Sequence, residues 1–205
     1  MKGLFARRSV TAVLSLILLG LIMGAHSLIP PTLATSEPIS TSGGIGSTVD
    51  ARQFTIEVQD VRFARTITDD AGGDDFGAVS EPIEANGVWV IVLATIESTR
   101  STMSSVTAEL DTGDDYTYSG TAWSANVFES SSPSLSPGRP VTGAFAFEVP
   151  EDRLTELSLR ATVSESADER LAAQADIDLG LSGSELTENV DGAEDVAAIP
   201  PIETH

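Results

Sequence analysis

The side chains in this sequence that could bind a metal ion or catalyse a reaction are mainly carboxylates. The 205 residues include 31 Asp and Glu against 11 Lys and Arg, for a formal net charge of −20 at pH 7. Residues 69–75 contain four aspartates and two glycines, and Asp111, Asp114 and Asp115 form a second group. Ca²⁺ takes about 6–8 oxygen ligands, which flexible acidic loops can supply. The two groups are therefore a candidate calcium site, although their spacing is not that of an EF-hand and a solvated acidic surface is the simpler interpretation.

A pair of carboxylates could also act in acid–base catalysis. Glycoside hydrolases use two carboxyl groups about 5–10 Å apart on either side of a sugar, but no motif here marks such a pair. Other catalytic side chains are scarce: His26 lies in an apolar N-terminal run, His205 is the last residue, Lys2 is the only lysine, and cysteine is absent. These counts exclude Ser-His-Asp triads, histidine or thiolate metal centres and Schiff-base chemistry from the folded part. We expect no enzyme activity, no catalytic residue and no cofactor.

The charge is distributed unevenly along the chain. All acidic residues follow Ser36, whereas Lys2, Arg7 and Arg8 precede it. An acidic surface repels phosphate backbones, so we expect no nucleic-acid binding, and it disfavours close approach to anionic lipid headgroups. Cationic ligands, divalent ions or basic protein partners are favoured, while solubility or adaptation to salt explains the same charge.

The N-terminal residues have the pattern of a membrane-targeting segment. Lys2, Arg7 and Arg8 precede residues 10–29, a run of 20 residues without charge. As a helix this run would be about 30 Å long, the thickness of the hydrocarbon core of a bilayer. The basic residues before it predict a cytoplasmic N-terminus and an extracytoplasmic remainder. Residues 1–34 are either an uncleaved single-pass anchor, which the length favours, or a signal peptide whose removal gives a secreted protein.

The remaining sequence divides into three parts. Residues 35–47 are rich in Ser, Thr and Gly and predict a flexible spacer. Residues 182–205 have six acidic residues, no Lys or Arg, and a Pro-Pro pair, which predicts a disordered acidic tail. Residues 48–181 between them contain the apolar runs that can form a core.

Those apolar runs have the period of strands. Apolar and polar residues alternate most clearly at residues 141–149, 157–163 and 171–181, and residues 88–96 are apolar on both faces, as in a central strand. The alternation changes phase near Asp60, which predicts a β-bulge. Seven or eight strands with regular turns and no convincing helix predict an all-β, immunoglobulin-like antiparallel β-sandwich, preceded by one N-terminal hydrophobic helix.

Two tryptophans are the aromatic candidates for ligand contact. Trp89 lies inside an apolar strand, so we expect it in the core. Trp123 follows Ser-Gly-Thr-Ala and is expected to be a packed loop residue, with a place on the rim of a binding site as the alternative.

Three stretches resemble a known family. Residues 87–92 look like a strand that opens after a glycine, residues 110–116 like a strand, tight turn and aromatic, and residues 135–150 contain Leu-Ser-Pro-Gly, Gly143 and Phe-Glu-Val-Pro. Together, over about residues 47–165, they resemble the immunoglobulin-like extracellular domains of unknown function on bacterial, especially actinobacterial, lipoproteins and membrane-anchored proteins, and more broadly a secreted mycobacterial immunogenic β-sandwich. The chain departs from this family at residues 97–99, where members often have Asn, and in lacking a lipidated cysteine. The resemblance implies a fold and a compartment, and it carries over no catalytic residue.

These observations predict a non-catalytic, extracytoplasmic binding or interaction module of the bacterial cell envelope. An edge strand or a loop would contact an unidentified envelope protein or ligand. The alternatives are a carboxylate-dependent hydrolase of envelope glycans and a calcium-responsive structural domain.

Overall fold

The structure is a computed structural model that describes residues 17–20, 39–70, 81–103, 106–113, 116–163 and 173–205. The chain divides into two units, Met1–Glu37 and Pro38–His205. In the first unit residues 17–20 are helical, and the rest of the predicted targeting segment lies outside the described residues. Among the helices that are described, none has the length and apolar character needed to cross a membrane.

The second unit consists mainly of strands. In chain order they are β1 (Ile39–Gly44), β2 (Thr48–Asp50), β3 (Phe54–Asp69), β4 (Ile83–Ser98), β5 (Val106–Asp111), β6 (Thr117–Ser119), β7 (Val141–Val149), β8 (Glu156–Val163), β9 (Ala173–Ser182), β10 (Ala197–Ile199) and β11 (Glu203–Thr204). The helices are α2 (Phe128–Ser131), α3 (Gly183–Asp191) and a 3-10 turn at Glu151–Arg153. In the described residues eight strands, β2 to β9, lie in the predicted domain at residues 48–181, in agreement with the predicted seven or eight, and β1, β10 and β11 are added from segments outside it.

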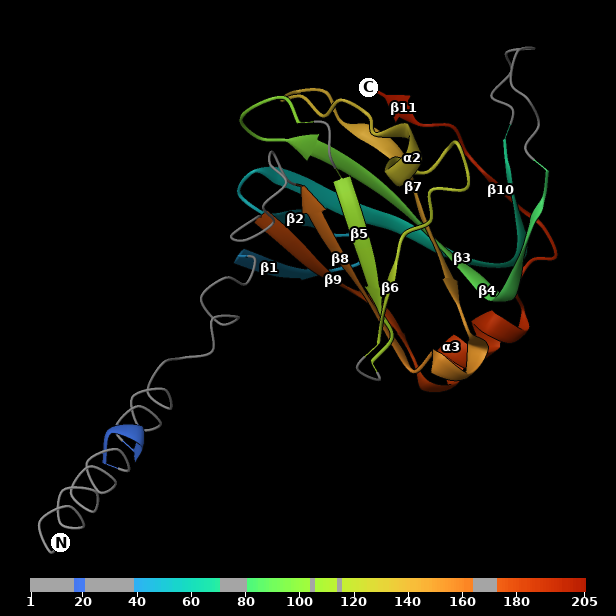
Figure 1. The fold of residues 1–205 in the computed structure, drawn as a ribbon. Coiled ribbons are helices and arrows are strands. Elements are labelled where there is room, and N and C mark those ends of the chain that lie inside the picture. The colour runs from blue at the N-terminus through green and yellow to red at the C-terminus, as the bar shows by residue number, and fades with distance from the viewer. Residues whose placement is uncertain (1–16, 21–38, 71–80, 104–105, 114–115, 164–172) are drawn as a thin grey trace, which may run out of the picture. The chain divides into compact units, whose positions relative to one another are not determined.

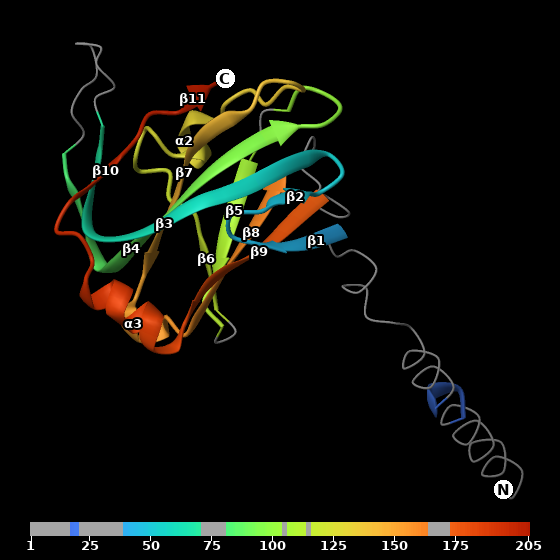
Figure 2. The same cartoon turned by 180° about the vertical axis from the view of Figure 1, so that it is seen from behind.

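The strands form two sheets that face each other as a β-sandwich (Figure 1, Figure 2). Sheet A has the order β1-β9-β8-β5-β6, and sheet B has the order β10-β3-β4-β7-β11 with β2 beside β3. The pairs β1–β9 and β10–β3 are parallel, and the other pairs are antiparallel. Both parallel pairs use segments from outside residues 48–181. The all-β sandwich is thus confirmed and is antiparallel within the predicted domain, with parallel strands added from its two ends.

The main core lies between the sheets and follows the alternation of the strands. Phe54, Ile56 and Val58 of β3 are fully buried, and the inward side chains of β5 and β9 pack in the same cluster. Strand β4 is buried on both faces, as predicted, because Trp89 and Ile91 lie on its other side in a second apolar cluster. The outer face of sheet B is therefore apolar and needs a cover.

The C-terminal residues provide part of that cover, so the prediction of a disordered acidic tail at residues 182–205 was wrong. Helix α3 buries Leu186 and Val190 in the main core, whereas β10 buries Ala197 and Ile199 on the outer face of sheet B. Strand β10 pairs with β3, and β11 pairs with β7. The C-terminal segment is ordered because it packs on both apolar clusters, and each Å² of apolar surface removed from water gains about 25 cal/mol. Ala197 and Ile199 pack directly in the cluster around Trp89.

The flexible spacer predicted at residues 35–47 was also wrong for the part that is described. Residues 39–44 form β1, which pairs with β9 from Ile39 opposite Ala173 to Gly44 opposite Asp178. Gly43 is required by packing, since a Cβ there would overlap the side chain of Val49. Residues 35–38 lie outside the described residues.

The predicted bulge is confirmed, and three residues of the motif at residues 135–150 have clear structural roles. The pairing of β3 with β4 shifts register between Val58 and Asp60, which is the expected bulge. Gly138 has a φ of +73° in its turn, and Pro150 follows the last residue of β7. Gly143 marks a close approach, because a Cβ there would lie 3.0 Å from Phe128 Cζ.

Candidate functional site

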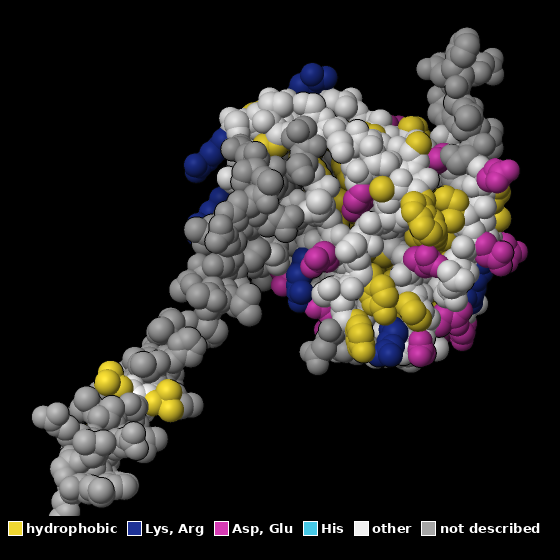
Figure 3. All heavy atoms as spheres, in the orientation of Figure 1, with side chains coloured by type: hydrophobic (Ala, Val, Ile, Leu, Met, Phe, Trp, Pro, Cys, Tyr) yellow, Lys and Arg dark blue, Asp and Glu magenta, His cyan; other side chains and the backbone are white. Residues whose placement is uncertain are grey.

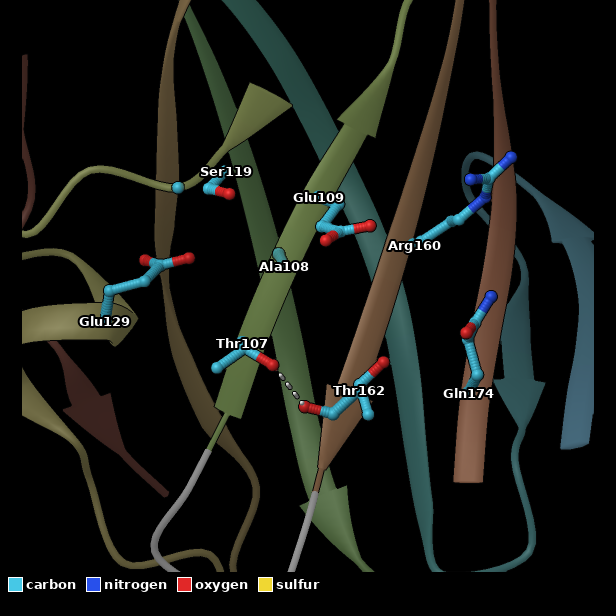
Figure 4. Close-up of a pocket in the computed structure, with 9 residues that line it drawn as sticks. Thr107, Ala108, Glu109, Ser119, Glu129, Arg160, Thr162 and Gln174 are labelled. Atoms are coloured by element: carbon cyan, nitrogen blue, oxygen red, sulfur yellow. Dashed lines mark hydrogen bonds between the residues drawn. The ribbon is translucent and has the colours of Figure 1, made fainter. Parts of the chain in front are cut away.

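A cavity of about 330 Å³ opens on the outer face of sheet A (Figure 4). Three strands form its floor with outward-facing side chains: Thr107 and Glu109 of β5, Arg160 and Thr162 of β8, and Gln174 of β9. One side is closed by Ser119, Gly120 and Glu129. These floor residues alternate with buried residues that face the core, so strand alternation alone turns the polar side chains toward the cavity.

Strand register arranges the floor in rows. Thr107 lies opposite Thr162, which lies opposite Gln174. In the next row Arg160 lies between Glu109 and Asp176. The Thr107 hydroxyl donates a hydrogen bond to the backbone oxygen of Thr162 at 3.4 Å. The floor is thus polar, with one guanidinium among carboxylates.

Arg160 is paired diagonally across the strands. Its Nη2 donates to Asp111 Oδ2, and the same carboxylate accepts a hydrogen bond from the backbone N–H of Gly113 at 2.9 Å. No described residue donates a hydrogen bond to the carboxylate of Glu109. Glu109 is therefore an accessible acceptor beside a guanidinium that already has a partner.

Glu129 is the most unusual group of the site. It lies on α2, and its carboxyl points toward β5 from the side opposite Arg160 (Figure 4). Both oxygens are buried, and neither accepts a hydrogen bond of normal geometry from the described residues. Burial raises the pKa of Glu129 to about 8, although the backbone amides of Glu129 and Ala108 act in the opposite direction. At neutral pH this side chain is mainly a neutral acid, which can donate a hydrogen bond as well as accept one.

The local sequence makes room for this carboxyl. A Cβ on Gly120 would overlap Glu129 Oε1, so a larger residue at this position would displace the carboxyl. Strand β6 pairs with β5 only along Glu109–Asp111, and the last bond across this edge runs from Gly120 N to Ala108 O at 3.1 Å. Glu129 therefore lies beside β5 at the place where its neighbouring edge strand ends.

The two tryptophans have opposite environments. Trp89 is fully buried, as predicted, and its Nε1 donates to Ile83 O at 3.0 Å. Trp123 is 70% exposed, so the expectation of a packed loop residue was wrong and the alternative of an exposed aromatic contact remains. Its loop is held without burial of the indole, because the Asp69 carboxylate accepts the backbone N–H of Ala125 at 3.1 Å.

The predicted calcium site is only partly within the described residues. Asp69 binds the loop that follows Trp123, and Asp111 binds Arg160. The aspartates at 74, 75, 114 and 115 lie outside the described residues. In the described part of the chain no three acidic, His or Cys side chains come together as a metal site. Calcium binding stays a prediction, and an unchanged melting temperature between chelator and millimolar calcium would remove it.

Sequence reasoning did not single out Glu109, Glu129 or Gly120. The alternation of Thr107 and Glu109 with buried neighbours was a usable signal for the floor of the cavity. Nothing in the local sequence marks Glu129, because its burial depends on strands that are distant in the chain.

No family model and no curated protein matches this sequence. The chain is similar to the crystal structure, at 1.90 Å resolution, of an uncharacterized beta-sandwich protein from Clostridium difficile 630. The sequence identity is 14%, the match covers 73% of this chain and 99% of that chain, and the TM-score is 0.44. The assignment of this chain as a β-sandwich rests on its own two facing sheets.

Proposed function

We propose that this chain is a non-catalytic binding module of the bacterial cell envelope, with the β-sandwich outside the cytoplasm and the N-terminal segment as its membrane anchor. The observation that carries the binding role is the polar cavity on sheet A with Glu129 at its side. The basic residues before the apolar run at 10–29 support the location, as does the resemblance to immunoglobulin-like extracellular domains.

The cavity suits a ligand that presents N–H groups or a positive charge. The carboxylate of Glu109 is an open acceptor, and Thr107, Ser119 and Gln174 add hydroxyl and amide groups. A cation beside Glu129 would favour its ionised form, so binding would release a proton. The acidic surface of the chain would attract such a ligand from a distance.

The neighbouring edge of sheet A offers a mode of contact. Strand β5 extends to Val106 beyond its pairing with β6, and Gly120 and Glu129 lie beside its edge at Ala108. An extended segment of a partner can add backbone hydrogen bonds at the remaining edge near Val106. The proposed ligand is therefore a basic, extended segment of an envelope protein.

Cross-linking on intact cells that express the tagged full-length protein, followed by mass spectrometry, tests this proposal. Glu129→Gln should reduce recovery of the partner by about tenfold, since a charged hydrogen bond contributes roughly 1.5–3 kcal/mol. Glu84→Gln is the matched control, because Glu84 is an exposed carboxylate on sheet B. Equal recovery with both variants, or recovery that persists when the sandwich is deleted, contradicts the proposal.

A hydrolase of envelope glycans is the second candidate. Glu109 and Glu129 line the same cavity, and a general acid must be protonated at the working pH, as Glu129 is at neutral pH. Release of reducing ends from peptidoglycan fragments by the purified protein, abolished in Glu129→Gln, would favour the hydrolase and overturn the non-catalytic role.

A further inference from the structure

A second cavity, of about 300 Å³, lies at the start of β1. Among the described residues it is lined by Ile39, Arg52, Gln53, Arg100 and Ala173. The two arginines come from separate turns: Arg52 lies between β2 and β3, and Arg100 follows β4. In a chain with 31 acidic residues and 11 basic ones, the charged side chains that line this cavity among the described residues are both basic.

These two arginines differ from three other arginines of the described residues, and they share with Arg139 the absence of a side-chain partner there. Arg62, Arg65 and Arg160 each form an ion pair with a carboxylate. No described residue forms a hydrogen bond or ion pair with the guanidinium of Arg52 or Arg100. Neither guanidinium has a carboxylate partner among the described residues, although carboxylates are abundant in this chain. Several of their N–H donors are therefore open toward a ligand.

The backbone holds the two arginines together. Arg52 has a φ of +69°, a left-handed conformation that glycine adopts far more easily. Asp50 Oδ1 accepts the backbone N–H of Arg52 at 2.8 Å, and the Thr99 hydroxyl donates to Arg52 O at 2.7 Å. Thr99 N also donates to Gln53 O at 2.9 Å. Because Arg100 follows Thr99 directly, one set of hydrogen bonds fixes both turns. The same hydrogen bonds hold Arg52 in its unfavourable left-handed conformation.

Figure 3 shows dark-blue basic side chains along the left margin of the sandwich, where the β2–β3 and β4–β5 connections are. Most magenta Asp and Glu side chains in this view lie toward the lower right, with other basic side chains among them. Asp50 is close in sequence to Arg52, but it does not line the cavity.

We propose that this cavity binds the phosphate group of a phosphate ester. A guanidinium binds phosphate oxygens in a bidentate manner, and two of them neutralise a phosphate better than one. The side-chain amide of Gln53 adds a donor, and Ile39 and Ala173 provide an apolar wall for the organic part of the ester. The volume lies at the lower end of the range for small-molecule sites.

Two sources of such a phosphate are a lipid headgroup and a soluble phosphate ester. Residues 30–38 separate the apolar run from Ile39, and a chain of this length spans at most about 30 Å. If the N-terminal segment is the membrane anchor proposed above, a lipid headgroup is within reach of the cavity. The soluble ester requires no anchor, so the phosphate site itself does not depend on the proposed function.

Both sources can be tested with the full-length chain, ¹⁵N-labelled, in non-ionic detergent micelles. The probes are inorganic phosphate, glycerol phosphate, and micelles that contain phosphatidylglycerol or, for comparison, phosphatidylcholine. The Nε–H signals of Arg52 and Arg100 are followed during each titration. Arg139 is the internal reference, because it is exposed, lies outside the cavity and has no side-chain partner among the described residues.

Arg52→Gly and Arg100→Gln should each weaken binding at least about tenfold, and Arg139→Gln should change it less than about twofold. Arg52→Gly also relieves the left-handed backbone, so its melting temperature should not fall and its loss of binding cannot be caused by unfolding. Shifts with glycerol phosphate identify a soluble ester, and shifts only with phosphatidylglycerol identify a headgroup. Absence of shifts with every probe, or an equal loss of binding in Arg139→Gln, overturns the proposal.

Discussion

Replacement of Glu129 by Gln tests whether the carboxyl beside the sheet A cavity is held as a neutral acid. Gln has nearly the same size and can occupy the same space next to Gly120, but it cannot ionise. Any pH dependence that this substitution removes therefore belongs to Glu129.

The size of the effect follows from the two pKa values. Burial raises the pKa of Glu129 from 4.5 to about 8, and one pKa unit corresponds to about 1.36 kcal/mol. Because the folded state holds the proton more tightly, the stabilising contribution of Glu129 is complete below pH 4.5, falls as the pH rises, and is lost above pH 8. The full change is about 5 kcal/mol. If the carboxylate turns toward solvent in the adjacent cavity, the change falls to about 2 kcal/mol, which is still measurable.

Urea unfolding between pH 4 and pH 9 measures this change. The full-length chain in non-ionic detergent is unfolded at each pH, and the emission of buried Trp89 reports the transition. The stability of Glu129→Gln relative to wild type should rise by about 2–5 kcal/mol across this range. Glu84→Gln is the control for charge, because it removes an exposed carboxylate of sheet B.

A difference between Glu129→Gln and wild type that varies by less than about 0.5 kcal/mol across the range would refute the reasoning. It would mean that the carboxyl is solvated and ionises with an ordinary pKa. Proton release on ligand binding would then have no basis, and the role of Glu129 as a general acid would be lost with it.

Three further substitutions test the packing on which the site depends. Gly120→Ala places a Cβ against Glu129 Oε1, so the carboxyl should move into the cavity. Its pKa should then fall toward 4.5, which ¹³C NMR titration measures. A pKa that stays at about 8 would contradict this contact. Gly87→Ala brings a Cβ against the backbone oxygen of Val149, which cannot move aside, and should lower the free energy of unfolding by about 3 kcal/mol or more in urea. Ile199→Ala should cost about 2–5 kcal/mol because this side chain is fully buried, whereas a disordered tail would give no change in the same assay.

The strands inside residues 48–181 were predictable because their signal is local. Alternation with period two requires only that one face of each strand is buried, and the bulge near Asp60 was visible as a change of phase. The burial of β4 on both faces was visible in the same way. For the site, the outward position of Glu109 follows from the alternation of β5, and the exposure of Trp123 does not follow from its neighbours in sequence.

The sequence by itself determined the composition of the core, the period of its strands and the absence of cysteine and lysine from the domain. The structure adds His205 to the domain, because its backbone N–H donates to Pro140 O at 3.0 Å. Only the tertiary structure decided which polar segments are ordered. Strand β1 is ordered because it pairs with the edge of β9. Strand β10 is ordered because it packs on the apolar face around Trp89. The raised pKa of Glu129 and the position of Arg52 and Arg100 in one cavity also depend on the tertiary structure. Burial, solvation and the approach of charges depend on residues far apart in the chain, and these interactions leave no local pattern in the sequence.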